Sequence, residues 1–223
     1  MKNSIKMIIT DLDGTLLRDD KTVSERNKLA LSRCRELGIK VIFATGRAYR
    51  TKIVPQNWFD GYARCNGAYA CAGETEIYRR TISDNDRRYI LDVCNQRKIT
   101  IEPRNDEEIY LPDIKPEDAE YLTSILPRDL YLLVYKENFG QIMHTEATKS
   151  KAIEALARYY AINQSETVAF GDDINDKDLI DWAGTGVAMG NALNEIKAIA
   201  NEVCLSNEED GVAIWIENNV FAL

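Results

Sequence analysis

The stretch that decides the fold is Asp11-Leu12-Asp13-Gly14-Thr15-Leu16-Leu17, which directly follows Ile5-Lys6-Met7-Ile8-Ile9-Thr10. The preceding run is short, apolar and rich in β-branched residues, so it predicts a buried parallel strand that ends in a sharp turn. Side chains alternate in direction along a strand and Gly14 permits a tight turn, so the two aspartates can point different ways. Two like charges about 4 Å apart repel by roughly 4 kcal/mol at an effective dielectric of 20, a cost that a divalent cation or a proton would offset.

The composition is that of an ordinary globular protein with an excess of acidic residues. The 223 residues include 45% hydrophobic and 29% charged residues, and the formal net charge is −8. This length allows one large core, or one core with a smaller module. The negative charge argues against a nucleic-acid-binding surface, and no apolar run approaches the roughly 20 residues that a membrane span needs. We therefore expect neither nucleic acid nor membrane as a partner.

Two further features predict a cytoplasmic protein. The N-terminus leads straight into the first strand and shows no secretory signal peptide. The five cysteines are scattered along the chain, without a Cys-x-x-Cys pair that would suggest zinc. We interpret them as reduced core residues.

Strands alternate with helices in the first and last parts of the chain. After the first strand, Ser24 is an N-cap candidate for a helix that runs to Leu37. A buried strand over residues 39–44 follows, and strand, helix and strand at this spacing form a right-handed βαβ unit. The pattern resumes with an amphipathic helix over residues 149–160 and a buried strand over residues 167–170. This order predicts an α/β fold with a doubly wound parallel sheet.

The pattern changes in the middle of the chain, where short strands and helices are mixed. An expected hairpin over residues 69–79 opens this part, and four of the five prolines lie in it. Its alternating apolar runs predict a separate small sheet. We therefore divide the chain into a core of residues 1–69 and 146–223 and an inserted α/β cap of residues 70–145.

Polar loops follow three of the predicted core strands. In an open parallel sheet, ligand sites form outside the carboxyl ends of the strands, so these loops should meet at one edge. With the start of the later amphipathic helix, they bring acids, a hydroxyl, an amide and a cation to that edge, namely Asp11, Asp13, Thr45, Lys149, Asp172, Asn175 and Asp176. Carboxylates are ligands that Mg²⁺ prefers, and the other groups can bind phosphate oxygens. The set predicts phosphoryl transfer.

These motifs resemble those of the haloacid dehalogenase-like (HAD) phosphatases, specifically the Cof-like subfamily IIB with an α/β cap inserted after the third strand. The family signatures occur in order as Asp11-Leu12-Asp13-Gly14-Thr15, Ala44-Thr45-Gly46-Arg47, Lys149, and Gly171-Asp172-x-x-Asn175-Asp176. The resemblance covers nearly the whole core, while the cap matches only by position and size. One departure is Ser150, where relatives usually carry glycine, and we expect it to have little effect.

The resemblance implies a role for each residue of the site. Asp11 would be the nucleophile that forms an aspartyl phosphate, and Asp13 would protonate the leaving alkoxide and then take a proton from the attacking water. Mg²⁺ would be held by Asp11, by the backbone carbonyl of Asp13 and by Asp172. The phosphate would be bound by Thr45, Gly46, Lys149 and Asn175, and Asp176 would lie behind the metal ligands and pair with Lys149.

Other residues near the implied site receive weaker assignments. Asn66 and Gly67 follow the third strand and would face the cap, so they are candidates for substrate contact. Arg47 and Arg104 could compensate the charge of an anionic substrate, but we expect them to be solvated surface residues. We expect Tyr110 and Tyr135 to belong to the core or the surface of the cap sheet.

The resemblance implies a Mg²⁺-dependent phosphohydrolase of small phosphorylated metabolites, such as sugar phosphates, phosphoglycolate-like acids or nucleotides. A cap that closes over the site would exclude water and select the leaving group. A phosphotransferase or phosphomutase with the same aspartyl phosphate is an alternative. A non-enzymatic phospho-receiver is a further one, against which Asp13 argues because an acid beside the nucleophile speeds loss of the phosphate.

Overall fold

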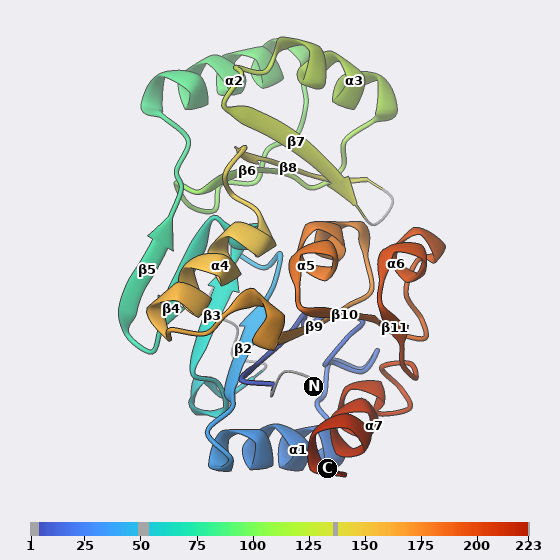
Figure 1. Cartoon of the computed structure of the whole chain (residues 1–223). Coiled ribbons are helices and arrows are strands. Elements are labelled where there is room, and N and C mark those ends of the chain that lie inside the picture. The colour runs from blue at the N-terminus through green and yellow to red at the C-terminus, as the bar shows by residue number, and fades with distance from the viewer. Residues whose placement is uncertain (1–4, 49–53, 136–137, 223) are drawn as a thin grey trace.

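The computed structural model describes residues 5–48, 54–135 and 138–222, which form a large and a small sheet (Figure 1). The large sheet has eight strands. From edge to edge they are β11 (Glu202–Val203), β10 (Thr185–Ala188), β9 (Thr167–Gly171), β1 (Met7–Thr10), β2 (Lys40–Ala44), β3 (Gly61–Arg64), β4 (Tyr69–Ala72) and β5 (Thr75–Arg79). The first six are parallel to one another, whereas β4 and β5 are antiparallel additions. The predicted α/β class with a largely parallel core sheet is confirmed.

Strand β1 lies in the middle of the large sheet, between β2 and β9. All four of its residues are buried, as expected for a short apolar run covered on both faces. The register pairs Thr10 with Phe43 on one side and with Phe170 on the other. Because the three strands end at the same level, the loops that follow them meet at one edge of the sheet.

Helices cover both faces of the large sheet (Figure 1). On one face lie α1 (Glu25–Glu36) and α7 (Gly211–Ile216), and on the other lie α4 (Lys149–Tyr159), α5 (Lys177–Trp182) and α6 (Asn194–Ile199). The predicted N-cap of α1 is confirmed, because Ser24 Oγ accepts a hydrogen bond from the backbone N–H of Asn27 at 3.0 Å. Helices on both faces explain why the inner strands are apolar throughout.

The hairpin of β4 and β5 belongs to the large sheet. The predicted cap boundary at residue 70 placed this hairpin in the cap, whereas β4 pairs directly with β3. The cause is the tight turn Cys65–Gly67, in which Asn66 has φ +48° and Gly67 has φ +96°, so the chain reverses next to β3. We therefore propose that the cap begins after β5, near residue 80, and ends near residue 145.

The small sheet and two helices form the cap. Its strands are β6 (Glu108–Leu111), β8 (Phe139–His144) and β7 (Leu130–Tyr135), and its helices are α2 (Asp84–Arg97) and α3 (Pro116–Ile125). The helices lie on the outer face of this sheet and the other face points toward the core (Figure 1). A separate apolar cluster that includes Ile90, Leu122 and Ile142 holds the layers together. None of the helices in the described ranges is long and apolar enough to cross a membrane.

Candidate active site

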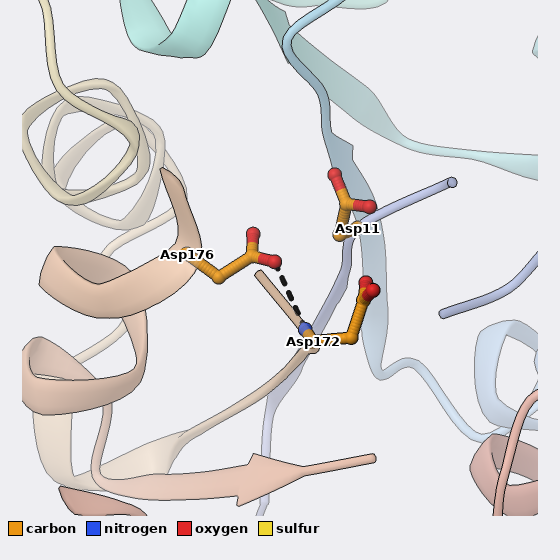
Figure 2. Close-up of side chains that lie close together, drawn as sticks. All are labelled: Asp11, Asp172 and Asp176. Atoms are coloured by element: carbon orange, nitrogen blue, oxygen red, sulfur yellow. Dashed lines mark hydrogen bonds between the residues drawn. The ribbon is translucent and has the colours of Figure 1, made fainter. Parts of the chain in front are cut away.

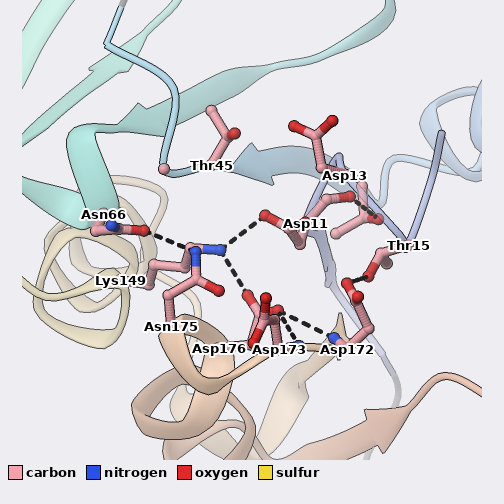
Figure 3. Close-up of polar contacts among 12 residues, drawn as sticks. Asp11, Asp13, Thr15, Thr45, Asn66, Lys149, Asp172, Asp173, Asn175 and Asp176 are labelled. Carbon is pink, nitrogen blue, oxygen red and sulfur yellow. Dashed lines mark hydrogen bonds and ion pairs between the residues drawn. The ribbon is translucent and has the colours of Figure 1, made fainter. Parts of the chain in front are cut away.

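A buried lysine lies between two aspartates at the carboxyl edge of the large sheet. The Nζ atom of Lys149 donates to Asp11 Oδ1 at 2.7 Å and to Asp176 Oδ1 at 2.5 Å (Figure 3). Asp11, Lys149 and Asp176 are all buried, and the most exposed of them, Asp11, is only 5% exposed. Asp11 follows β1, Lys149 begins α4, and Asp176 lies in the loop after β9. The fold thus brings together three polar residues that were predicted to lie at one edge.

The position of Lys149 depends on close contact with the turn after β3. A Cβ atom at Gly67 would lie 1.9 Å from the carbonyl oxygen of Thr148, and the backbone there has φ +96°. Both observations require glycine. Thr148 in turn is the N-cap of α4, since its hydroxyl accepts from the N–H of Lys151 at 3.3 Å. Gly67 was predicted as a candidate for substrate contact. The structure shows that glycine is also needed there for packing, because it allows the backbone at the start of α4 to lie against the turn.

Three carboxylates converge beside this lysine. One oxygen each from Asp11, Asp172 and Asp176 lie within 4.8 Å of one another (Figure 2). Thr15 Oγ1 donates to Asp172 Oδ1 at 2.8 Å, and the backbone N–H of Asp172 donates to Asp176 Oδ2 at 3.0 Å. A Cβ atom at Gly14 would lie 2.3 Å from Asp172 Oδ2, so glycine allows this close approach. The cluster is therefore held in place by its own loops.

The chemistry of this donor set fits a hard divalent cation. All three donors are carboxylate oxygens, which Mg²⁺ and Ca²⁺ prefer to nitrogen or sulfur ligands. The single ammonium group of Lys149 offsets only part of their charge. Asp176, predicted to lie behind the metal ligands, accepts from Lys149 with Oδ1 and from the backbone N–H groups of Asp172 and Asp173 with Oδ2. The side chain of Asp13, in contrast, is not part of the cluster.

Burial and the neighbouring charges set the protonation of Asp11. Burial raises its pKa, Lys149 lowers it, and Asp176 and Asp13 raise it further, so that the pKa of Asp11 is about 7. Burial opposes the charged form of Lys149, but Asp11 and Asp176 outweigh this effect and raise the pKa of Lys149. Lys149 is therefore a permanent cation. A divalent cation in the cluster would favour the ionised, nucleophilic form of Asp11.

Asp13 is bound by two cations and is not part of the carboxylate cluster. Arg47 donates to its carboxylate from Nε at 2.6 Å and from Nη2 at 2.7 Å, and Lys21 Nζ lies at 3.1 Å. Burial alone would raise the pKa of Asp13, but Arg47 and then Lys21 lower it to about 2. In this arrangement Asp13 is ionised and can accept a proton but has none to donate. Arg47, expected at the solvated surface, is instead a partner of a candidate catalytic acid.

Three of the four residues expected to bind phosphate line one cleft of about 300 Å³ together with Asp11 and Asp13, whereas the fourth, Lys149, is buried and does not line it. Thr45, Gly46 and Asn175 form part of its wall. The hydroxyl of Thr45 accepts from the backbone N–H of Arg47 at 3.2 Å, which fixes the loop after β2. The fold thus places this part of the predicted set beside the candidate nucleophile, and the roles remain predictions.

A chain of side-chain amides connects this cleft with the cap. Asn175 Nδ2 donates to Asn66 Oδ1 at 2.9 Å, and Asn66 Nδ2 donates to Gln141 Oε1. Gln141, on β8, donates to Glu108 of β6 and to the carbonyl oxygen of Gly46 at 3.2 Å. Asn66, a candidate for substrate contact, is therefore engaged on both sides by protein groups. Gln141 was not among the predicted residues, and a polar residue within an apolar strand was the available signal.

The cap contributes four side chains to the same cleft. They are Arg104, Tyr110, Tyr135 and Phe139, which we call the cap wall. Arg104 was expected at the solvated surface, and the two tyrosines were expected in the cap core or on its sheet. Nothing in their sequence spacing indicates that they share a cleft with Asp11, because they come from three separate segments of the cap.

Comparison with known proteins identifies the family. The model of the haloacid dehalogenase-like hydrolases matches residues 8–125 and 114–216. The putative phosphatase YxeH of Bacillus subtilis is 30% identical, over 97% of this chain and 99% of that protein. A second B. subtilis relative, the 5-amino-6-(5-phospho-D-ribitylamino)uracil phosphatase YitU, is 26% identical, over 97% of this chain and 98% of that protein.

A solved structure agrees in fold and subclass. The sugar phosphatase BT4131, described as a member of HAD subclass IIB, superposes with a TM-score of 0.82 at 25% identity, and the match covers 96% of this chain and 98% of that one. Its cap subclass is the one that the sequence motifs had indicated. The chain therefore belongs to the haloacid dehalogenase-like hydrolases and is a phosphatase of the Cof-like subclass IIB.

Proposed function

We propose that the protein is a Mg²⁺-dependent phosphohydrolase that removes phosphate from small phosphorylated metabolites through an aspartyl phosphate. The observation that carries this proposal is the contact of 2.7 Å between Lys149 Nζ and Asp11 Oδ1. It holds a buried carboxylate at the open edge of the sheet, next to two further acids and the loops that carry Thr45 and Asn175.

Asp11 is the group we assign to attack phosphorus. Its carboxylate oxygen forms a bond to phosphorus while the bond from phosphorus to the alcohol oxygen breaks, and water later hydrolyses the acyl phosphate. Lys149 contacts Asp11 directly and can also neutralise charge on the phosphoryl oxygens as it develops. Thr45, the backbone of Gly46 and Asn175 orient the phosphate because they line the same cleft.

Asp11 and Asp172, with the backbone carbonyl of Asp13, are the residues we assign to hold Mg²⁺. The bound ion would supply charge neutralisation that lets an anionic phosphate approach an anionic carboxylate. Asp176 orients Asp172 through the backbone hydrogen bond at 3.0 Å and shares Lys149 with Asp11. The observation behind the metal assignment is the cluster of oxygen donors.

Asp13 is assigned to protonate the leaving alkoxide and to take a proton from the attacking water. The contacts with Arg47 and Lys21 keep it ionised in the present arrangement. Donation of a proton therefore requires that substrate binding loosen these contacts. We regard Arg47 as the group whose movement sets the protonation of Asp13.

The experiment that tests the proposal uses p-nitrophenyl phosphate with and without Mg²⁺. Asp11→Asn should abolish hydrolysis, and EDTA should silence the wild-type protein reversibly. Asp13→Asn should accumulate phosphoenzyme, which would be measured by acid quench with labelled substrate. Full turnover by Asp11→Asn would remove the mechanism. Addition of an alcohol as acceptor distinguishes a phosphohydrolase from a phosphotransferase, because a transferase would yield more phosphorylated acceptor than free phosphate.

A further inference from the structure

The named relatives act on quite different leaving groups, a ribitylaminouracil in one case and a sugar in another. Their names therefore do not choose a substrate for this chain. The cap wall faces the catalytic edge across one cleft of about 300 Å³, so its chemistry bears on the choice. Any substrate assigned from this cleft rests on the proposed phosphohydrolase function.

Aromatic rings form most of the cap wall. The rings of Tyr110 and Phe139 are stacked with centroids 6.1 Å apart, and the rings of Tyr135 and Phe139 are tilted with centroids 6.2 Å apart. Tyr110 is buried, whereas Phe139 is 38% exposed. A ring left this exposed beside a cleft offers an apolar face to a bound group.

The cation of the cap wall is already neutralised within the cap. Arg104 lies with its guanidinium carbon 3.2 Å from the Tyr110 ring centroid, and its nitrogens lie 3.2 Å from Glu102 and 3.7 Å from Glu108. Glu108 is 1% exposed. An acidic leaving group that drew Arg104 away would leave this buried carboxylate without its cation, which is unfavourable.

The other two cations that line the cleft lie on its opposite side, at the edge of the large sheet. Lys21 and Arg47 both contact Asp13, so one carboxylate is shared by two cations close to Asp11. They lie on the side where the phosphoryl group, the doubly charged part of any phosphomonoester, would bind. Among the described residues that line the cleft, the cap side carries no surplus cation for a second acidic group.

We propose that the substrate is a phosphomonoester whose alcohol carries a planar unsaturated ring and no second acidic group, as in a nucleoside monophosphate. The ring packs on the cap wall, chiefly on Phe139, while the phosphate lies at Asp11. In the reaction the phosphorus–oxygen bond to the alcohol breaks, water supplies the new oxygen of inorganic phosphate, and the neutral ring-bearing alcohol leaves.

The test compares kcat/KM for three phosphate esters in Mg²⁺: uridine 5′-monophosphate, ribose 5-phosphate and phosphoglycolate. The first two share the phosphate and the ribose and differ in the ring, so their ratio measures recognition of the ring. Stacking of one base on an aromatic side chain predicts a ratio of about ten or more in favour of the nucleotide. Phosphoglycolate should be the poorest of the three.

Two substitutions of Phe139 test whether the cap wall causes the preference for the nucleotide. Phe139→Leu keeps apolar bulk but removes the flat ring, so it should lower the ratio severalfold, and Phe139→Tyr should retain it. Tyr121→Ala is the control, because Tyr121 is a partly exposed aromatic residue on the outer helix α3 and does not line the cleft.

The outcomes separate this inference from the proposed function. Equal turnover of the nucleotide and ribose 5-phosphate, or a preference for phosphoglycolate, would overturn the ring assignment and leave the phosphohydrolase standing. A ring preference that survives Phe139→Leu would overturn the role of the cap wall. Absence of hydrolysis of every ester, including p-nitrophenyl phosphate, would instead remove the proposed function.

Discussion

The catalytic edge and the cap wall face each other across one cleft, yet they differ in how the fold specifies them. At the edge, buried charges occupy fixed positions next to glycines that no other residue could replace, as at Gly14 and Gly67. The cap wall consists of aromatic side chains and one arginine from separate segments, and Phe139 is partly exposed. On the proposed assignments, the residues of the reaction are held by the backbone of the core, whereas substrate selectivity depends on cap side chains that can change without disturbing that backbone.

The largest effect should follow from removing the buried cation at the edge. Lys149→Met leaves Asp11 and Asp176 facing each other without their shared partner, so kcat/KM for p-nitrophenyl phosphate should fall roughly 10³-fold. Lys151→Met, an exposed neighbour on the same helix, is the control and should retain activity. Near-normal turnover by Lys149→Met would show that the edge does not depend on its charges.

A second substitution tests whether the backbone of the edge is as restricted as the distances imply. Gly67→Ala forces a Cβ atom to within 1.9 Å of the Thr148 carbonyl oxygen and should destabilise the protein by about 3 kcal/mol or more, with loss of activity. Gly38→Ala is a matched control, because Gly38 also has positive φ, +80°, but has open space around it.

Urea unfolding would compare the two alanine variants. For Gly38→Ala only the cost of the left-handed backbone remains, about 1 kcal/mol. Equal destabilisation by both substitutions would mean that contact with Thr148 is not what requires glycine at position 67.

Stability of the cap should depend on pH through Glu108. Burial raises its pKa to about 7, although Arg104 and Gln141 lower it. The folded protein therefore binds the proton of Glu108 more tightly than the unfolded chain does. For this reason the contribution of Glu108 to the free energy of unfolding falls as pH rises from about 4.5 to 7. It does not recover above pH 7. The glutamine of Glu108→Gln stays neutral at every pH. The free energy of unfolding of this variant, relative to that of the wild type, should therefore be about 2 kcal/mol higher at pH 8 than at pH 5.

Unfolding in urea at the two pH values would measure this difference. The control is Glu120→Gln, at an exposed position on α3. It should change the free energy of unfolding by the same small amount at both pH values. A Glu108→Gln effect that does not change with pH would contradict the assignment.

The smallest expected effect concerns the link between the two regions. Gln141→Leu removes the cap's hydrogen bond to Gly46 and the partner of Asn66, so Asn175 loses its support. We expect kcat to fall about tenfold, since the three hydrogen bonds of Gln141 are lost while the acids at the edge remain in place. Gln96→Leu, at an exposed position on α2, is the control. An unchanged kcat would show that the cap acts without this amide chain.

The sequence predicted the edge well because each part of it is a local motif at the end of a strand. Asp11, Thr45 and Asp172 follow strands whose apolar runs are unambiguous, and parallel strands carry their loops to the same edge. The hairpin of β4 and β5 was predicted in the cap but pairs with the large sheet, because its sequence pattern does not reveal its partner strand. Pairing with β3 is decided by the turn at Asn66 and Gly67, and sequence periodicity carries no such information.

The cap side and the partners of Asp13 could not be predicted for a related reason. Arg47 was identified as part of a motif, but whether its guanidinium turns to solvent or to Asp13 depends on side-chain geometry. Gln141 and Glu108 contact each other across two strands of the cap sheet, and their contact with the core depends on how the cap is placed. Such relations appear only when separate segments are packed together. The assignment to the cytoplasm likewise stays a prediction.

The short connection between β8 and α4 has a mechanical consequence. Residues 145–148 alone join the end of the cap to the helix that begins with Lys149, and the hydroxyls of Tyr131 and Tyr78 hold the carbonyls of Ala147 and Glu146 at 2.8 and 2.7 Å. We expect any movement of the cap relative to the core to turn about this tether. His144, next to it, should then move less than Phe139 at the opposite end of β8.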